Sequence, residues 1–175
     1  MEITTWYLEQ TSPADLRPAA TADVTVTRAE VVSPELNRFL YSSVGGDWHW
    51  VDRLGWTWRQ WHDWLDRPGV ETWVAYRHGT PAGYVELDGT ADGEVEIAYF
   101  GLLPAFVGQG IGGHLLTKGI RRAWELATRR VWVHTCSLDG PAARTNYEAR
   151  GMSLYRTETT NEDVSPTPGP WPGAH

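Results

Sequence analysis

Residues 103–113 read Leu-Pro-Ala-Phe-Val-Gly-Gln-Gly-Ile-Gly-Gly, and they separate two segments of different periodicity. Residues 94–100, before them, are rich in β-branched and aromatic residues and alternate in polarity, which predicts a strand. The segment after them, 114–128, has the apolar spacing of one helical face, at Leu115, Leu116, Ile120, Ala123, Trp124 and Ala127. A glycine-rich loop is therefore predicted at the N-terminus of a helix.

Such a loop can bind an anion, because the first amides of a helix have no partner inside it and the helix dipole is positive there. The alternative is a tight turn before a surface helix that binds no ligand. Gly108, Gly110 and Gly113 match the dinucleotide spacing G-x-G-x-x-G. However, five residues separate Leu102 from Gly108, and too little sequence follows to complete a dinucleotide-binding sheet. No Gly-Lys-Ser/Thr follows either, which disfavours a Walker-type loop.

A second motif follows the next predicted strand. Residues 140–152 read Gly-Pro-Ala-Ala-Arg-Thr-Asn-Tyr-Glu-Ala-Arg-Gly-Met. Together the two motifs resemble those of the GNAT superfamily of acyl-CoA-dependent N-acetyltransferases, in which Arg/Gln-x-x-Gly-x-Gly/Ala opens a helix and Asn-x-x-Ala-x-x-x-Tyr-Glu-x-x-Gly-Phe follows. Val107, Gly140 and Met152 depart from these patterns. The close match covers about 60 residues.

The order of the other predicted elements extends this resemblance to most of the chain. We predict strands at 3–8, 24–32, 71–77, 82–87, 94–100, 130–136 and 152–160, and helices at 33–45, 57–67, 114–128 and 141–150. The resemblance implies an α/β (α+β) fold with a mixed, mostly antiparallel central sheet and helices on both faces. We expect one domain over residues 1–162 and a proline-rich tail over 163–175. Since that tail favours no strand, either the N-terminal strand or the partner subunit of a homodimer is expected to fill the last edge of the sheet.

Composition narrows the class of protein. The net charge of −7 and the pI near 5.3 disfavour nucleic acid as a partner and suit a cationic amine. The sequence contains no apolar run of about 20 residues and no secretory signal, so we expect a cytoplasmic location and no membrane contact. A single cysteine and the lack of paired histidine spacings predict no disulfide and no metal.

The resemblance also implies a reaction, in which acetyl-CoA is the co-substrate and acylates an amine. Its pyrophosphate would bind the backbone amides of residues 108–113, and its pantetheine arm would pair with Leu102 and Leu103. The residues predicted to bind the phosphates are Gly108, Gln109, Gly110, Ile111, Gly112 and Gly113. Tyr147 stands where the family has a proton donor to the leaving thiolate. Glu96 is the predicted general base, with Glu94 or a chain of water molecules as the alternative.

The acceptor site is expected in the tryptophan-rich region. Seven of the eleven tryptophans lie between residues 48 and 73, where they either wall a pocket or pack the core. We predict that acceptor contacts come from Trp48, Trp50, Trp58 and Trp61, because indole faces bind ammonium groups and aromatic rings. Asp47 and Asp52 are candidates for binding the amine.

Three functions remain open at this point. The first is acetylation of a primary amine of a small, aromatic molecule by direct attack on the thioester. The second is a peptide or protein lysine acetyltransferase, and the third is a non-catalytic acyl-CoA-binding or interaction module. A thiol-acyltransferase built on His134 and Cys136 is disfavoured, because residues two apart on a strand seldom make the contact that activates a nucleophile.

Overall fold

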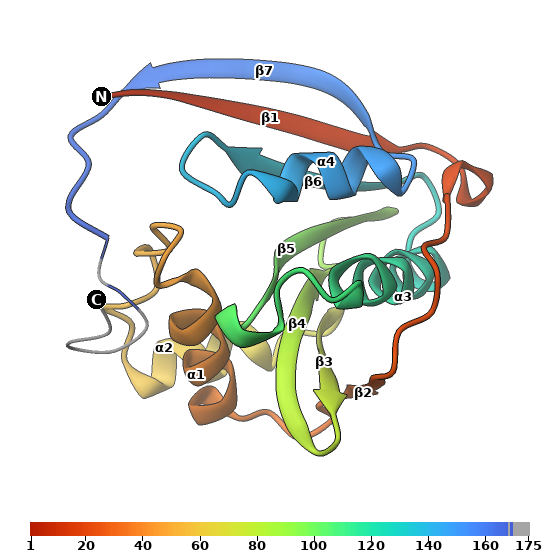
Figure 1. Ribbon diagram of the computed structural model, residues 1–175, viewed down its shortest axis with the longest axis horizontal. Helices are drawn as coiled ribbons and strands as arrows, with labels where there is room; N and C mark the ends of the chain where they lie inside the picture. The colour runs from red at the N-terminus through yellow and green to blue at the C-terminus, as the bar shows by residue number, and fades with distance from the viewer. Residues whose placement is uncertain (168, 170–175) are drawn as a thin grey trace.

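The computed structural model describes residues 1–167 and 169 of the 175-residue chain. In these residues seven strands form one sheet with the order β2-β3-β4-β5-β6-β1-β7 (Figure 1). The strands are β1 (Glu2–Gln10), β2 (Thr25–Arg28), β3 (Val70–Arg77), β4 (Thr80–Asp88), β5 (Glu94–Leu102), β6 (Arg130–Cys136) and β7 (Ser153–Asn161). Within this part of the chain every pairing is antiparallel except β5 with β6.

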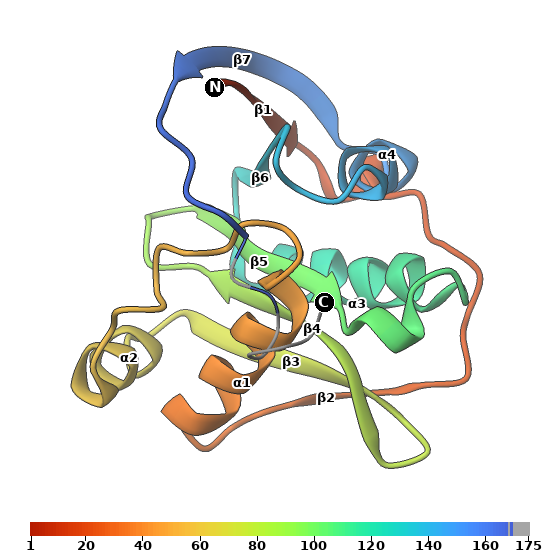
Figure 2. The ribbon, with the colours of Figure 1, turned by 60° about the vertical axis from the view of Figure 1, so that its left-hand side comes forward.

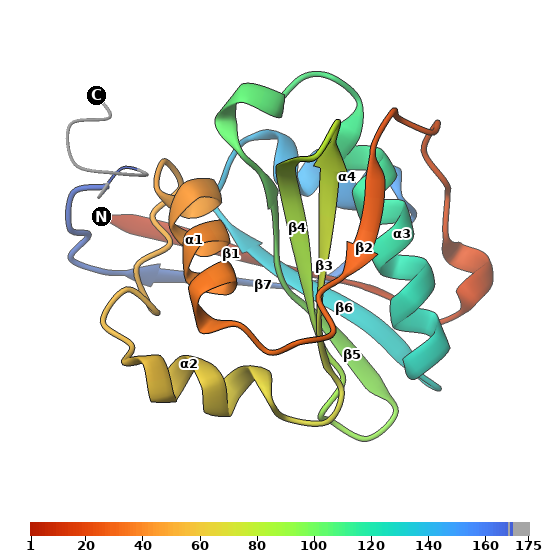
Figure 3. The same ribbon diagram turned by 90° about the horizontal axis from the view of Figure 1, so that it is seen from below.

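Helices cover both faces of the sheet (Figure 3). The helices α1 (Pro34–Gly45) and α2 (Trp58–Leu65) lie on one face, and α3 (Ile111–Leu126) and α4 (Ala142–Ala149) on the other. Two of the predicted helix starts are confirmed: Ser33 Oγ accepts a hydrogen bond from Leu36 N, and Thr57 forms a capping box with Gln60. The predicted mixed, mostly antiparallel fold with helices on both faces is thus confirmed.

The cores on the two faces have different compositions. On the α3 face the buried side chains are mainly aliphatic, with Val85, Leu115 and Ile120 fully buried. On the α1–α2 face buried aromatic residues such as Tyr41 and Trp61 share the core with aliphatic ones, and further aromatic rings pack around them. The residues between α1 and α2, which no periodicity assigned, form a series of turns.

The N-terminal strand β1 lies between β6 and β7 (Figures 1 and 2). It pairs with β6 from Thr5–Cys136 to Gln10–Val131 and with β7 from Glu2–Asn161 to Glu9–Ser153. Of the two alternatives for completing this end of the sheet, the chain therefore uses its own first strand. The strand predicted at 24–32 is shorter than expected, because β2 ends at Arg28 and only Ala29 N continues the bonding, to Thr72 O.

The sheet opens between β5 and β6. These two strands pair over three positions only, and the last is Glu96 opposite Trp132. Beyond it β5 stays with β4, and β6 stays with β1. The pairing of β4 with β5 shifts by one residue at Ala98, which is the mark of a β-bulge. An opening lined by strand backbone is thereby created next to the glycine loop.

Candidate active site

The glycine loop adopts a backbone conformation that favours glycine. Gly108 has φ = 83° and Gly110 has φ = 79°, in the left-handed region that side chains with a Cβ rarely occupy. Gly110 caps α3, which begins at Ile111, three residues earlier than predicted. The first turn of the helix therefore consists of Ile111, Gly112 and Gly113, whose amides have no acceptor inside the helix. This is the geometry of an anion site.

Side chains from distant segments hold the loop in place. Gln109 donates from Nε2 to Ala105 O at 3.0 Å, and its Oε1 accepts from Arg77 Nη1 at 2.9 Å. A Cβ at Gly113 would lie 2.9 Å from Ala19 Cβ and 2.7 Å from the guanidinium of Arg150, so only glycine fits there. The role of Gln109 visible in the structure is thus to fix the loop through its side chain.

Arg150 places a positive charge at the first turn of α3. Its Nη1 approaches Gly113, and its buried Nε has no hydrogen-bond partner in the described part of the chain. A buried, unpaired guanidinium nitrogen is costly, and a phosphate oxygen would satisfy it. Sequence reasoning missed this residue, although it lies inside the second motif, three residues after Tyr147.

Backbone groups of β5 face the opening. Leu103 donates its N–H to Ala82 O at 2.8 Å, and its carbonyl accepts from Phe106 N at 3.0 Å. The N–H of Leu103 is thus already paired with β4, whereas pairing of its carbonyl with a pantetheine arm stays a prediction. Because hydrogen bonding alternates along an antiparallel strand, the neighbouring Leu102 points its backbone away from β4 and toward the opening.

Tyr147, the predicted proton donor, lies on α4 beside this opening. Its side chain is 5 % exposed, and its ring centroid is 5.9 Å from that of Phe100 on β5. Burial raises the pKa of the Tyr147 phenol, and the carboxylate of Asp139 adds to this effect. The phenol therefore stays protonated over the whole neutral range, as a proton donor must.

The two candidate bases have different partners. Glu94 lies 3.1 Å from Arg130 and 3.6 Å from Arg129, so its charge is balanced by two guanidinium groups. Glu96 lies instead beside His134 of β6, with 3.3 Å between Glu96 Oε1 and His134 Nδ1. The contact with Glu96 raises the pKa of the His134 imidazole, against the opposing effect of burial. The structure therefore distinguishes Glu96 from its rival.

Asp139 connects β6 with the segment between α1 and α2. Its carboxylate accepts hydrogen bonds from Trp50 Nε1 at 3.2 Å, from the Thr135 hydroxyl at 2.6 Å and from Cys136 N at 3.1 Å. Burial, with the charge of Asp139, raises the pKa of the Cys136 thiol. A thiol held in its protonated form is a poor nucleophile, so this environment does not favour a thiol-acyltransferase built on Cys136.

The four predicted acceptor tryptophans lie in different surroundings. Trp50 packs on Tyr99 with ring centroids 4.8 Å apart, and Trp48 lies against Gly140 in the turn after β6. Trp58 is 58 % exposed on α2 and donates from Nε1 to Glu35. Trp61 is 1 % exposed and lies in the core. Trp48 and Trp50 are thus the two that adjoin β6 and Asp139.

A buried arginine explains much of the tryptophan density. Arg53 is 4 % exposed and makes a bidentate ion pair with Glu86, at 2.8 and 2.9 Å. Four rings surround its guanidinium, at 4.4 to 5.5 Å from the ring centroids, namely Trp56, Trp61, Trp64 and Tyr99. Here the tryptophans pack the core, as in one of the two alternatives derived from the sequence.

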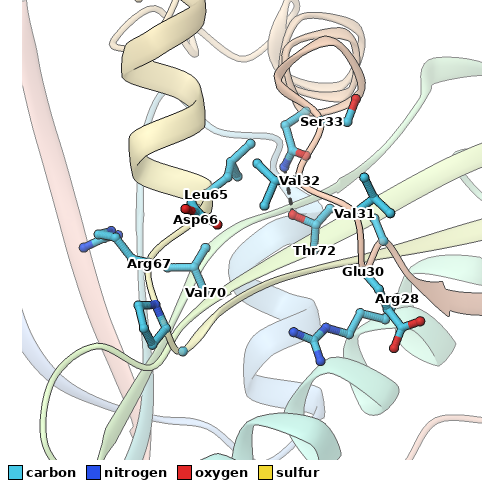
Figure 4. Close-up of a pocket in the computed structure, with 14 residues that line it drawn as sticks. Arg28, Glu30, Val31, Val32, Ser33, Leu65, Asp66, Arg67, Val70 and Thr72 are labelled. Carbon is cyan, nitrogen blue, oxygen red and sulfur yellow. Dashed lines mark hydrogen bonds between the residues drawn. The ribbon is translucent and has the colours of Figure 1, made fainter.

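A separate cavity of about 230 Å³ lies between the β2–α1 connection and the α2–β3 turn (Figure 4). Val32, Leu65 and Val70 line it, and a buried hydrogen bond from Asn37 to Thr72 at 2.8 Å crosses its wall. None of the residues predicted to act in catalysis or binding belongs to its lining. In the described residues no helix is long and apolar enough to cross a membrane, and no group of three potential ligands is arranged for a metal ion.

Comparisons with solved structures agree with this architecture. A GCN5-related N-acetyltransferase from Kribbella flavida is similar with a TM-score of 0.64 and 23 % identity, over 89 % of this chain and 56 % of that one. One from Sphaerobacter thermophilus has a TM-score of 0.60 and 19 % identity, over 89 % and 49 %. A conserved protein of unknown function from Staphylococcus epidermidis has 0.60 and 20 %, over 91 % and 60 %. At these identities the likeness shows the fold alone, and this chain spans 49 to 60 % of the length of these three structures.

The sequence itself assigns the family. No curated protein matches the chain significantly. The model of the acetyltransferase (GNAT) family, however, matches residues 36–152, which is most of the chain and includes the glycine loop, the opening and Tyr147. With the mixed sheet and its opening beside that loop, this match leads to one conclusion: the chain belongs to the acetyltransferase (GNAT) family.

Proposed function

We propose that the protein is an N-acetyltransferase that moves the acetyl group of acetyl-CoA to a primary amine of a small, aromatic molecule by direct attack. The observation that carries this proposal is the opening between β5 and β6, with the phenol of Tyr147 on one side and the Glu96–His134 pair on the other. A thioester between them would have a proton donor for its sulfur and a carboxylate near its attacking amine. Residues 1–162 form the proposed catalytic unit.

The cofactor would be held mainly by backbone. The amides of residues 108–113 suit the pyrophosphate, and Arg150 adds a cation at the first turn of α3. Leu102 offers the strand backbone that faces the opening. Val107, which departs from the family motif, is 59 % exposed, and its side chain is not needed for this cradle.

The acceptor side is acidic and aromatic. Glu96 and Asp139 lie near His134, and Asp52 adds a third carboxylate from the segment between α1 and α2. Carboxylates concentrate a cationic amine at the site, and the rings of Trp48 and Trp50 suit an ammonium or an aromatic group. This combination supports a small aromatic amine over a peptide lysine.

The test is release of CoA thiol from acetyl-CoA with a panel of aromatic amines, amino acids, polyamines and a lysine peptide. We expect turnover with the aromatic amines. Tyr147→Phe should lower kcat at least about tenfold, because the thiolate then leaves without its proton donor. Tyr155→Phe, on the half-exposed ring of β7, is the matched control and should leave kcat unchanged.

Two results would contradict the proposal. Acetyl-CoA binding without thiol release, whatever the amine, would favour the non-catalytic binding module. Turnover with the lysine peptide alone would support acetyl transfer to an amine, but the acceptor would then be a peptide lysine and not a small aromatic amine. A melting temperature of Tyr147→Phe close to that of the wild type has to accompany any loss of rate, so that misfolding is excluded.

A further inference from the structure

We propose that His134 is the general base of this acyl transfer and that Glu96 acts through it as a positioning residue. The inference rests on the proposed function and names the group that takes the proton of the amine. It also revises the sequence-based prediction, in which Glu96 itself takes that proton. Neither of the two sequence motifs includes His134, because it lies on β6, between the glycine loop and the motif of α4.

His134 lies on β6 just beyond the last residue that pairs with β5 on the same face. Glu96 and Trp132 form the last paired position of β5 and β6, and His134 is the next residue of β6 on the same face. The imidazole therefore lies where the two strands begin to separate, which is where the proposed thioester would lie. The rings of Trp132 and Tyr7 pack against it, with centroids 6.1 and 5.7 Å from that of His134. These contacts limit the orientations that the imidazole can take.

The imidazole of His134 is more accessible to solvent than the carboxylate of Glu96. The side chain of His134 is 49 % exposed, whereas that of Glu96 is 24 % exposed. Nδ1 of His134 faces Glu96 Oε1, so the neutral ring carries its proton on Nδ1 and presents the lone pair of Nε2 away from the carboxylate. An amine that enters from solvent meets Nε2 before it meets the carboxylate. Glu96 then fixes the tautomer and stabilises the imidazolium that forms.

The charges near His134 make its imidazole a stronger base. Titratable and charged groups surround His134 from several elements: Glu96 of β5, Tyr7 of β1, Cys136 of β6, Arg156 and Glu158 of β7, and Asp52 and Asp139 of the adjoining loops. The two β7 groups act at one remove, since Glu158 accepts from the Tyr7 hydroxyl and Arg156 lies over the Tyr7 ring. The contact with Glu96 raises the pKa of His134, and Asp139 and Asp52 act in the same direction. An imidazole made more basic in this way is suited to taking a proton from an amine.

In the proposed step the amine is acylated and the CoA thiol is released. The nitrogen of the neutral amine forms a bond to the thioester carbonyl carbon, and one of its protons passes to Nε2 of His134. The C–S bond breaks, its electron pair goes to sulfur, and the thiolate takes the proton of the Tyr147 hydroxyl. The products are the amide and the CoA thiol. The imidazolium then loses its proton to solvent, and the Tyr147 phenolate regains one from solvent.

The pH dependence of kcat/KM is the decisive measurement, with thiol release as the readout. His134 must be neutral to act, so kcat/KM should fall as pH drops through a pKa raised above the ordinary value of about 6.5. Glu96→Gln removes the main cause of the raised pKa, so this acidic limb should move to lower pH while a reduced rate persists. His134→Gln should abolish the limb and lower kcat about 100-fold or more.

A matched control is available on α2. His62 also adjoins a carboxylate, with 3.8 Å between its Nδ1 and Asp63 Oδ1, and it is remote from the opening. His62→Gln should keep both the rate and the limb. Acetyl-CoA affinity, measured by calorimetry, should be the same in all three variants, since none of the changes touches the glycine loop.

Several outcomes would overturn the inference. Loss of turnover at every pH in Glu96→Gln, with a limb that persists in His134→Gln, would make Glu96 the base. Should His134→Gln fail to bind acetyl-CoA, the Glu96→Gln profile decides, and an unmoved limb refutes the role of His134. If the wild type releases no thiol with any amine, the proposed function itself fails. If the wild type turns over and the His134 variant has the same rate and pH profile, only the role of His134 is refuted.

Discussion

The two faces of the sheet position their functional groups in different ways. On the α3 face, aliphatic side chains form the core, and the proposed anion site consists of the backbone of one continuous loop. On the α1–α2 face, aromatic rings surround a buried ion pair, and the proposed acceptor side collects side chains from β5, β6 and two loops. A site built from backbone can be predicted from a local motif, whereas a site built from converging side chains needs the fold.

The largest effect is expected for Glu86→Ala on the α1–α2 face. This change leaves the guanidinium of Arg53 buried without its carboxylate, which should lower the free energy of unfolding by about 3–5 kcal/mol. Urea denaturation measures the loss. If the loss is below about 1 kcal/mol, the ion pair does not organise this face in the way that we describe.

The double variant Arg53→Met with Glu86→Leu sharpens this test. It removes both charges and keeps apolar volume among the tryptophan rings, so it should recover most of the stability that the single change loses. Arg59→Ala serves as the exposed control. Its ion pair with Asp63 is solvent-exposed, and its removal should change the free energy of unfolding by less than about 0.5 kcal/mol.

A smaller effect is expected for Gly110→Ala on the α3 face. No atom lies within 4 Å of a Cβ at this position, so no steric clash is expected. The cost in conformational free energy, about 1–2 kcal/mol, comes from the φ of 79°. The loop should relax away from this geometry, and acetyl-CoA affinity should fall about five- to tenfold with KM for the amine unchanged. Gly55→Ala is the matched control, since it has open space and no positive φ. Equal affinity of both variants would refute the backbone cradle.

The smallest effect is expected for Trp58→Ala. Its ring is 58 % exposed and stacks on His62, away from Asp139, so stability should change by about 0.5 kcal/mol or less and KM for the amine should stay the same. Trp48→Ala, in the turn region next to Gly140, should instead raise KM. Steady-state kinetics on one amine compare the two, and the reverse order would move the acceptor side to α2.

The sequence predicted those features that depend on neighbouring residues. The caps at Ser33 and Thr57, the glycine loop and the limits of β6 follow from local patterns, and all agree with the structure. Strand register and burial do not follow from such patterns. The ion pair of Arg53 with Glu86 joins residues 33 positions apart, and the contact of Glu96 with His134 requires the relative register of two strands.

The difference between local patterns and tertiary packing also explains why the first turn of α3 and the different positions of the tryptophans do not follow from the sequence. The apolar periodicity of α3 starts at His114, because glycines contribute nothing to it, so its first turn was assigned to the loop. Spacing alone gives Trp58 and Trp61 the same expected role. Their exposed fractions of 58 % and 1 % arise from the direction in which α2 packs, which only the tertiary structure specifies.

The position of β1 has a consequence for the order of folding. In the described residues β7 pairs with β1 alone. β6 pairs with β5 at only three positions, so both β6 and β7 depend on β1 for most of their pairing. A nascent chain must therefore keep residues 2–10 unpaired until β6 and then β7, which ends at Asn161, have been synthesised. Contacts that span so much sequence slow folding, because loop closure precedes any gain from pairing. β1, which flanks β6 on the side away from the opening, can thus take its place only after strands that lie far behind it in the sequence.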